Sequence, residues 1–182
     1  MNYHLFRTIN DWSGNGFLDD LMKVVAKDAI FGVFAAFLVL LAFRLRERDP
    51  LPVLFSLGAL AATFGFAKLA SMWHGEARPW QTHEVHQLIA GGSGNSFPSE
   101  HATAAFGVAF VTLLFLSRSW GLLLTVAALA IGFSRVYVGV HYPGDIAAGA
   151  LAAVLGVVVA VVVAQPRKPA PSPYPPVGAA RR

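Results

Sequence analysis

The chain alternates between long apolar stretches and short polar segments. Five apolar stretches can be recognised, and they cover residues 28–43, 51–73, 102–117, 120–138 and 145–164. Because a helix needs about 20 apolar residues to cross a bilayer, the pattern predicts about five transmembrane helices. The third stretch is short, so we expect it to borrow flanking residues or to lie in a thinned region of the membrane.

The two ends of the chain differ from these stretches. The amphipathic segment 17–25 is expected to extend the first span backward. Before it, apolar residues have the spacing of a helix that lies in the membrane interface, namely Leu5, Phe6, Ile9 and Trp12. Residues 166–182 are rich in proline and alanine, which predicts a disordered cytoplasmic tail. Residues 1–165 are therefore expected to form a single domain.

Composition supports an integral membrane protein. Of the 182 residues, 55% are hydrophobic and 13% are charged, whereas soluble domains carry about 25% charged residues. The expected fold class is therefore all-α, a polytopic bundle of membrane helices. The absence of cysteine excludes disulfides and thiolate metal sites. The net charge of +4, with no basic stripe, argues against nucleic-acid binding.

The distribution of lysine and arginine predicts the orientation. With five spans, eight cations fall on one side of the membrane: Arg44, Arg46, Arg48, Arg118, Arg167, Lys168, Arg181 and Arg182. Cytoplasmic loops carry an excess of such residues, so we assign this side and the C-terminus to the cytoplasm. The outer side then holds the N-terminus, the loop 74–98 and the loop around His141.

One polar cluster on the outer side lies where the third apolar stretch begins. Ser99 follows Pro98 and precedes an apolar helix, so it is a candidate N-cap. A helix N-terminus presents free backbone N–H groups and the positive end of the helix dipole, which suits an anion. His101, in the first turn, faces the same mouth. The alternative interpretation is an ordinary cap beside an interfacial histidine.

A second cluster joins Arg135, His141 and Asp145 between the fourth and fifth stretches. His141 and Asp145 are four residues apart and share a face if the helix has begun by then. The carboxylate can accept from one ring nitrogen and leave the other free as nucleophile or base. Arg135 can bridge two oxyanions. The alternative is a snorkelling arginine with an interfacial histidine.

Arg78, before Pro79, supplies a second guanidinium, although alone it is better explained as a loop cation after a helix stop. Two arginines, two histidines, a helix N-terminus and an aspartate together indicate a phosphate site. Phosphoryl transfer requires stabilised equatorial oxygens, an in-line nucleophile and a protonated leaving group. This set supplies each of them without a metal or another cofactor.

These residues resemble the three signature motifs of the type 2 phosphatidic acid phosphatase (PAP2) superfamily. The motifs are Arg78-Pro79, then Pro98-Ser99-Glu100-His101, then Ser134-Arg135 followed by His141 and Asp145. The resemblance implies that His141 is the nucleophile and forms a phosphohistidine, that Asp145 orients it, and that His101 protonates the leaving oxygen. It also implies that Arg78, Arg135 and the region of Ser99 and Glu100 bind the phosphate.

Two positions depart from the family pattern. The position seven residues before Arg78, usually lysine, is Ser71, and Lys68 lies ten residues before. A ten-residue offset is expected to put Lys68 on a different face of the helix. Its role is open between phosphate binding and packing of its stem. Glu100 stands where glycine is usual, and an acidic residue there resembles the subgroup that dephosphorylates undecaprenyl pyrophosphate.

The loop 82–86 contains Glu84 and His86, and it superficially resembles a zinc-protease signature. The spacing of its histidines, His83 and His86, does not match, because that signature places them four residues apart. We therefore predict no metal here, and we expect Glu84 and His86 to line the pocket and contact a second phosphate.

The resemblance implies a phosphatase of the bacterial cell membrane with its site on the outer face. The expected reaction hydrolyses undecaprenyl pyrophosphate to undecaprenyl phosphate and phosphate, which recycles the carrier lipid for peptidoglycan synthesis. The alternatives are a phosphatidylglycerophosphate or phosphatidate phosphatase, a lipid phosphotransferase, and a non-catalytic lipid-binding or transport protein. Few polar groups lie within the spans, which argues against transport. The expected partners are the lipid and the bilayer, with no obligate protein partner.

Overall fold

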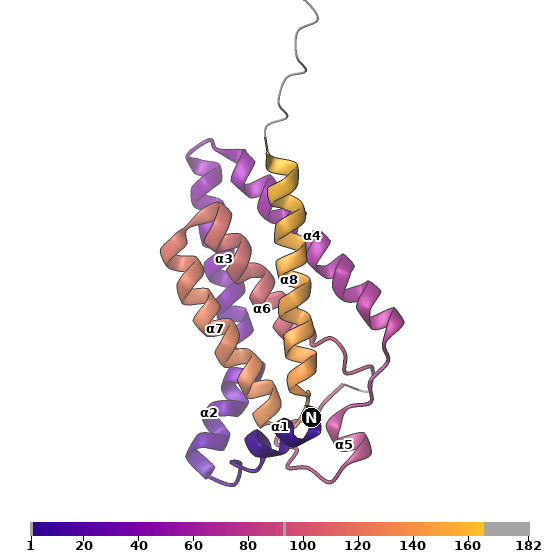
Figure 1. Cartoon of the computed structure of the whole chain (residues 1–182). Helices are drawn as coiled ribbons and strands as arrows, with labels where there is room; N and C mark the ends of the chain where they lie inside the picture. Colours follow the sequence, from indigo (N-terminus) through magenta and orange to yellow (C-terminus); the bar gives the residue numbers. More distant parts are fainter. Residues whose placement is uncertain (1, 93, 166–182) are drawn as a thin grey trace, which may run out of the picture.

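The computed structural model describes residues 2–92 and 94–165, so the tail predicted at 166–182 lies outside the described residues. The described part contains helices and no strand, which confirms the all-α fold class. The elements are α1 (Asn2–Asn10), α2 (Gly16–Lys27), α3 (Ala29–Arg46), α4 (Pro50–Trp73), α5 (Pro79–Thr82), α6 (Glu100–Val111), the π-helical turn η1 (Thr112–Leu116), α7 (Arg118–Tyr137) and α8 (Pro143–Ala164). Figure 1 shows a bundle of α3, α4, α6, α7 and α8, with α1, α2 and α5 gathered at one end.

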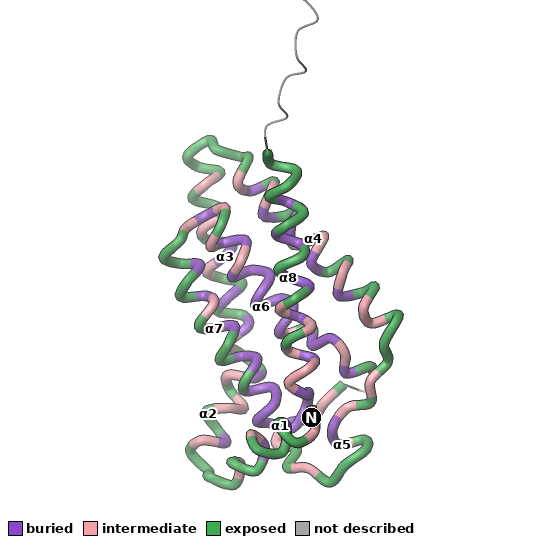
Figure 2. The backbone as a smooth tube through the Cα atoms, viewed as in Figure 1, coloured by how far each residue is buried: buried purple, intermediate pink, exposed green. Residues whose placement is uncertain are grey.

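Four helices, α3, α4, α7 and α8, are long and apolar enough to cross a membrane. The third predicted span corresponds to α6 and η1, which run from Glu100 to Leu116 and are shorter. Most residues of α6 are buried, and Figure 2 shows this helix inside the bundle. The prediction of about five spans therefore becomes four long helices around one short helix. Neighbouring helices cover α6, whereas Leu114 in η1 stays more than half exposed.

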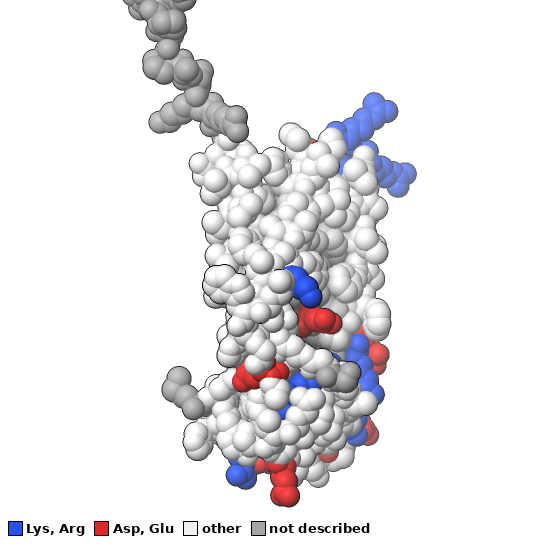
Figure 3. All heavy atoms as spheres, turned by 90° about the vertical axis from the view of Figure 1, so that its right-hand side faces the viewer, with Lys and Arg blue, Asp and Glu red and all other residues white. Residues whose placement is uncertain are grey.

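The outer faces of the long helices are apolar and exposed. Phe31 on α3, Leu54 on α4, Val126 on α7 and Val162 on α8 each leave more than half of their surface uncovered. Backbone polar groups within these helices are paired internally, so such faces suit contact with lipid tails. Figure 3 shows that charged side chains are sparse along the bundle and collect mainly at the end that holds α1, α2 and α5.

Small residues let α8 approach its neighbours closely, as the composition of the fifth stretch predicts. A Cβ atom on Gly149 would lie 2.8 Å from the backbone nitrogen of Thr103 on α6. A Cβ atom on Gly156 would lie 2.6 Å from the carbonyl oxygen of Ala59 on α4. Only glycine fits at these two contacts, so α8 is held against both α4 and α6.

The N-terminal elements differ from the prediction in two ways. The first span does not continue backward as one helix, because α2 ends at Lys27 and α3 begins at Ala29. In α1, Phe6 is fully buried and packs edge-on against Tyr142 rather than facing lipid. Leu5 and Trp12 stay more than half exposed and remain available to the membrane interface. The helix α1 is thus attached to the bundle by its apolar face.

Candidate active site

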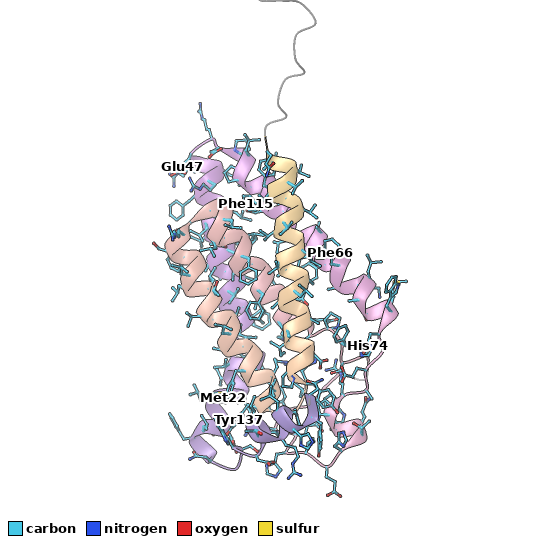
Figure 4. The ribbon with its side chains drawn as sticks, viewed as in Figure 1. Met22, Glu47, Phe66, His74, Phe115 and Tyr137 are labelled. Carbon is cyan, nitrogen blue, oxygen red and sulfur yellow. The ribbon has the colours of Figure 1, made fainter. Side chains whose placement is uncertain are left out.

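The sequence motifs meet at a cavity of about 550 Å³ near one end of the bundle. Segments far apart in the chain form its wall: α4, the segment before α5, loop residues 92 and 94–98, the start of α6, the end of α7 and the loop before α8. Six of the predicted site residues line it, namely Lys68, Arg78, Glu100, His101, Arg135 and His141. Figure 4 marks this end of the bundle by His74 and Tyr137, and the opposite end by Glu47.

His141 and Asp145 form a buried pair at the start of α8. The loop ends at Tyr142, so Asp145 stands in the first helical turn and its side chain folds back over the helix N-terminus. Oδ2 of Asp145 lies 3.2 Å from Nδ1 of His141 and accepts from the backbone N–H of Tyr142 at 2.9 Å. His141 is 3% exposed and Asp145 is not exposed at all. The predicted contact between the two side chains forms, but not on a shared helical face, because α8 begins at Pro143 and His141 lies in the loop before it.

Arg78 determines which nitrogen of His141 faces the cavity. Nη1 of Arg78 lies 3.3 Å from Nε2 of His141. A guanidinium can only donate, so Nε2 carries a lone pair and the ring proton is on Nδ1, where it is donated to Asp145. The lone pair of Nε2 therefore points toward a cation, at the place where an anionic substrate would bind.

The guanidinium of Arg78 is itself fixed by the loops around it. Its Nε donates to the carbonyl of Gly94 at 3.1 Å, and its Cζ lies 5.4 Å from the ring centre of Trp80. Burial lowers the pKa of Arg78, and the negative charges of Asp145 and Glu100 oppose that shift. Arginine nonetheless remains charged in proteins.

Burial sets the protonation state of His141. The pKa of His141 lies below its ordinary value because burial penalises the imidazolium, while the hydrogen bond with Asp145 partly opposes the shift. Arg135 and Arg78 add to the lowering by charge repulsion. His141 is thus neutral at neutral pH, which is the state that a nucleophile requires.

Arg135 reaches the cavity from the last turn of α7. Its Nη1 donates at 3.1 Å to the carbonyl of Ala26, one of the last residues of α2. These carbonyls lack helical partners because α2 stops before Asp28. Nε of Arg135 is buried and finds no hydrogen-bond partner in residues 2–92 and 94–165. The side chain is therefore anchored at one nitrogen and keeps donor capacity at another.

The three motif residues at the start of α6, Ser99, Glu100 and His101, have different positions relative to the cavity. Ser99 is the N-cap, as predicted, and its hydroxyl accepts from the backbone N–H of Ala102 at 3.5 Å. The hydroxyl is fully buried and does not line the cavity, so any contact of Ser99 with phosphate would have to be indirect. Glu100 and His101, in the first turn, do line the cavity.

Lys68 lies closer to the site than its sequence offset predicts. Lys68 and Ser71 both line the cavity from α4. Two residues three apart on a helix are only about 60° apart around its axis, so the expected difference of face is wrong. The displaced lysine therefore shares the wall in which the family pattern places its cation.

Glu84 and His86 do not line this cavity. They line a separate cavity of about 270 Å³ against α1, together with Arg7 and Asp11. The backbone of His86 pairs with the side chain of Asn10, and its Nδ1 lies 2.6 Å from Oγ of Ser13. Packing against α1 turns this loop away from the motif residues. Among residues 2–92 and 94–165, no cluster of three metal-ligating side chains forms.

Two site residues were missed by the sequence reasoning. The hydroxyl of Ser96, fully buried, donates to Oδ2 of Asp145. Asn95 accepts from the backbone N–H groups of Glu76 and Phe97 at 2.8 and 3.0 Å, and its amide donates to the carbonyl of His74. The only available signal was their position directly before the second motif. Their residue types are common in any loop.

Comparison with known proteins agrees with this geometry. The family model described as "PAP2 superfamily" matches residues 50–169. Undecaprenyl-diphosphatase BcrC of Bacillus subtilis is 33% identical over 158 residues, which cover 85% of this chain and 80% of that protein. The crystal structure of Aquifex aeolicus LpxE has a TM-score of 0.71 and 25% identity, covering 88% and 94% of the two chains. A PAP2-type phosphatidylglycerolphosphate phosphatase of Bacillus subtilis shares the fold, with a TM-score of 0.68, 19% identity and coverage of 88% and 85%. The chain therefore belongs to the PAP2 superfamily and is a membrane-embedded lipid phosphatase of that family.

Proposed function

We propose that this protein hydrolyses undecaprenyl pyrophosphate to undecaprenyl phosphate and inorganic phosphate. The observation that carries the proposal is the orientation of His141, whose unprotonated Nε2 faces the cavity beside Arg78. The name of the BcrC relative supports the choice of substrate. Glu100 supports it as well, since an acidic residue at this position resembles that subgroup.

The first chemical step transfers the terminal phosphoryl group to His141. Nε2 forms a bond to the terminal phosphorus as the bond between that phosphorus and the bridging oxygen breaks. His101 donates a proton to the departing oxygen. Arg78 and Arg135 donate to the equatorial oxygens, where negative charge accumulates. Asp145 stabilises the positive charge that develops on the imidazole ring.

The second step returns the enzyme to its starting state. A water molecule attacks the phosphohistidine, the N–P bond breaks, and His101 accepts a proton from the water.

A pyrophosphate group carries more negative charge than a monophosphate does, so its site requires more positive charge. Lys68 supplies it from α4, where it lines the cavity close to the apolar residue Phe64.

The site is proposed to lie at the outer face of the bacterial cell membrane. Arg44, at the far end of α3, donates to the carbonyl of Leu116. The cationic loops therefore gather at the end opposite to the cavity, and cytoplasmic loops are enriched in cations. At that face, the proposed reaction would recycle the carrier lipid for peptidoglycan synthesis.

A lipid panel with His141→Ala tests the proposal. Purified protein is assayed for phosphate release from undecaprenyl pyrophosphate, phosphatidylglycerophosphate and phosphatidate, with and without a chelator. We expect the pyrophosphate to be turned over fastest, without inhibition by the chelator, and His141→Ala to abolish turnover. If either of the other two lipids is turned over faster, that lipid is the substrate in place of undecaprenyl pyrophosphate. Retained activity in His141→Ala would refute the phosphohistidine, and a phosphorylated lipid product would indicate phosphotransfer.

A further inference from the structure

One oxygen of the Asp145 carboxylate is left without a partner. Every hydrogen bond that Asp145 accepts through its side chain, from His141, Ser96 and Tyr142, is made at Oδ2. Oδ1 is buried and has no hydrogen-bond partner among the residues that the structure describes. An unsatisfied buried carboxylate oxygen is costly, so a nearby donor is expected.

The carboxyl group of Glu76 is positioned to be that donor. Glu76 lies in the loop between α4 and α5, and two residues tie it to the start of α8. Ser96 donates its backbone N–H to the carbonyl of Glu76 at 2.8 Å, while its hydroxyl donates to Asp145. Asn2 donates to Oε1 of Glu76 at 3.4 Å and accepts from the N–H of Gly144 at 2.9 Å. Ser96 and Asn2 therefore each connect Glu76 to the first turn of α8, where Asp145 lies.

The charges around Glu76 favour its neutral form. Burial is the largest cause that raises the pKa of Glu76, and the neighbouring carboxylate of Asp145 raises it further. His74, 3.9 Å from Oε2, and the amide of Asn2 oppose the shift without reversing it. The other titratable group that faces Glu76 is Tyr142, and His141 lies beyond Asp145.

We propose that Glu76 is a positioning residue that holds a proton and donates it to Oδ1 of Asp145, so that the carboxylate stays aligned with His141. Two carboxyl groups in contact share one proton because two adjacent negative charges repel. Ionisation of Glu76 would break this hydrogen bond and push Asp145 away from His141. The inference rests on the proposed function only in taking His141 as the nucleophile.

The same contacts give α1 a part in the site. Asn2 precedes residues 50–169, the region that matches the family. It nevertheless binds both Glu76 and the first turn of α8. The ring of Tyr3 stacks on His83 at 3.9 Å between centres. The N-terminal helix thus braces the proton-holding residue from outside the matched region.

Three variants test the proposal in a kcat profile against pH. The wild type should lose kcat as pH rises through the pKa of Glu76. Glu76→Gln, whose amide donates at every pH, should keep activity and lack this loss. Glu76→Ala should lower kcat at least tenfold at all pH values with KM within twofold. The matched control Glu84→Gln, in the loop after α5 and away from Asp145, should follow the wild-type profile.

An infrared measurement tests the proton directly and needs no turnover. The band of a protonated carboxyl group should appear in the wild type at neutral pH, vanish on alkaline titration, and be missing in Glu76→Gln. The proposal is overturned if the wild type and Glu76→Gln show the same infrared spectrum in this region. It is also overturned if their pH profiles superimpose, or if the kcat of Glu76→Ala stays within twofold of the wild type. If no lipid is hydrolysed, the proposed function fails while the infrared band still decides the state of Glu76.

Discussion

The substitution Asp145→Asn tests the core of the proposed mechanism. Nδ1 of His141 lies 3.2 Å from Oδ2 of Asp145. When the imidazole becomes positively charged on attack, the attraction at this distance is about 5 kcal/mol for an effective dielectric constant of about 20. Asparagine can retain neutral hydrogen bonds, each of about 1 kcal/mol, but not the charge interaction. We therefore expect the barrier to rise by about 3–5 kcal/mol, which lowers kcat roughly 10²–10⁴-fold.

The assay is phosphate release from undecaprenyl pyrophosphate in detergent micelles, with kcat and KM measured separately. KM should change little, because Asp145 lies behind His141 and does not line the cavity. Asp20→Asn is the matched control, since that carboxylate pairs with Lys23 on the surface of α2, away from the cavity. A folded Asp145→Asn variant whose kcat stays within tenfold of the wild type would refute the reasoning.

Three further predictions concern the groups around this pair. Ser96→Ala removes a hydrogen bond to a charged carboxylate, which is worth about 1.5–3 kcal/mol. We therefore expect kcat to fall roughly 10–100-fold at unchanged KM. A fall in kcat of less than twofold would contradict this expectation. Lys68→Met keeps the stem but removes the cation from the cavity wall. KM for the pyrophosphate should rise about tenfold in this variant, and Lys68→Arg should restore it. Equal KM values in the wild type and both variants would exclude a contact of Lys68 with phosphate. Burial lowers the pKa of His141, and the attacking form is neutral. On the acidic side, kcat/KM should therefore fall as pH drops through this lowered value, below the ordinary value of about 6.5. An acidic limb above that value would argue against His141 as the titrating group.

The helices could be predicted because membrane segments have a simple local signature. A bilayer requires a sufficient length of apolar residues with internally paired backbone groups, and both conditions can be judged from a sequence window. The second stretch, predicted at 51–73, is observed as α4 from Pro50 to Trp73. The break at Asp28 and the central burial of α6 could not be judged in this way. They depend on which helices surround each segment.

The candidate site was predictable where ionisable residues stand at the edges of apolar stretches. Arg78, His101, Arg135 and His141 have that position, and all of them line one cavity. Glu84 and His86 have similar chemistry and lie in an outer loop, yet packing against α1 places them elsewhere.

What the sequence determined by itself is the set of membrane helices and the residues of the three motifs. Hydrophobicity and spacing are local properties, and a helix converts spacing directly into a shared face. What only the tertiary structure decided is which atoms meet across distant segments. Those contacts place Ser96 on Asp145, Lys68 in the cavity wall and Asn2 against Glu76. The physical reason is that such contacts depend on how whole helices pack, which no single stretch of residues specifies.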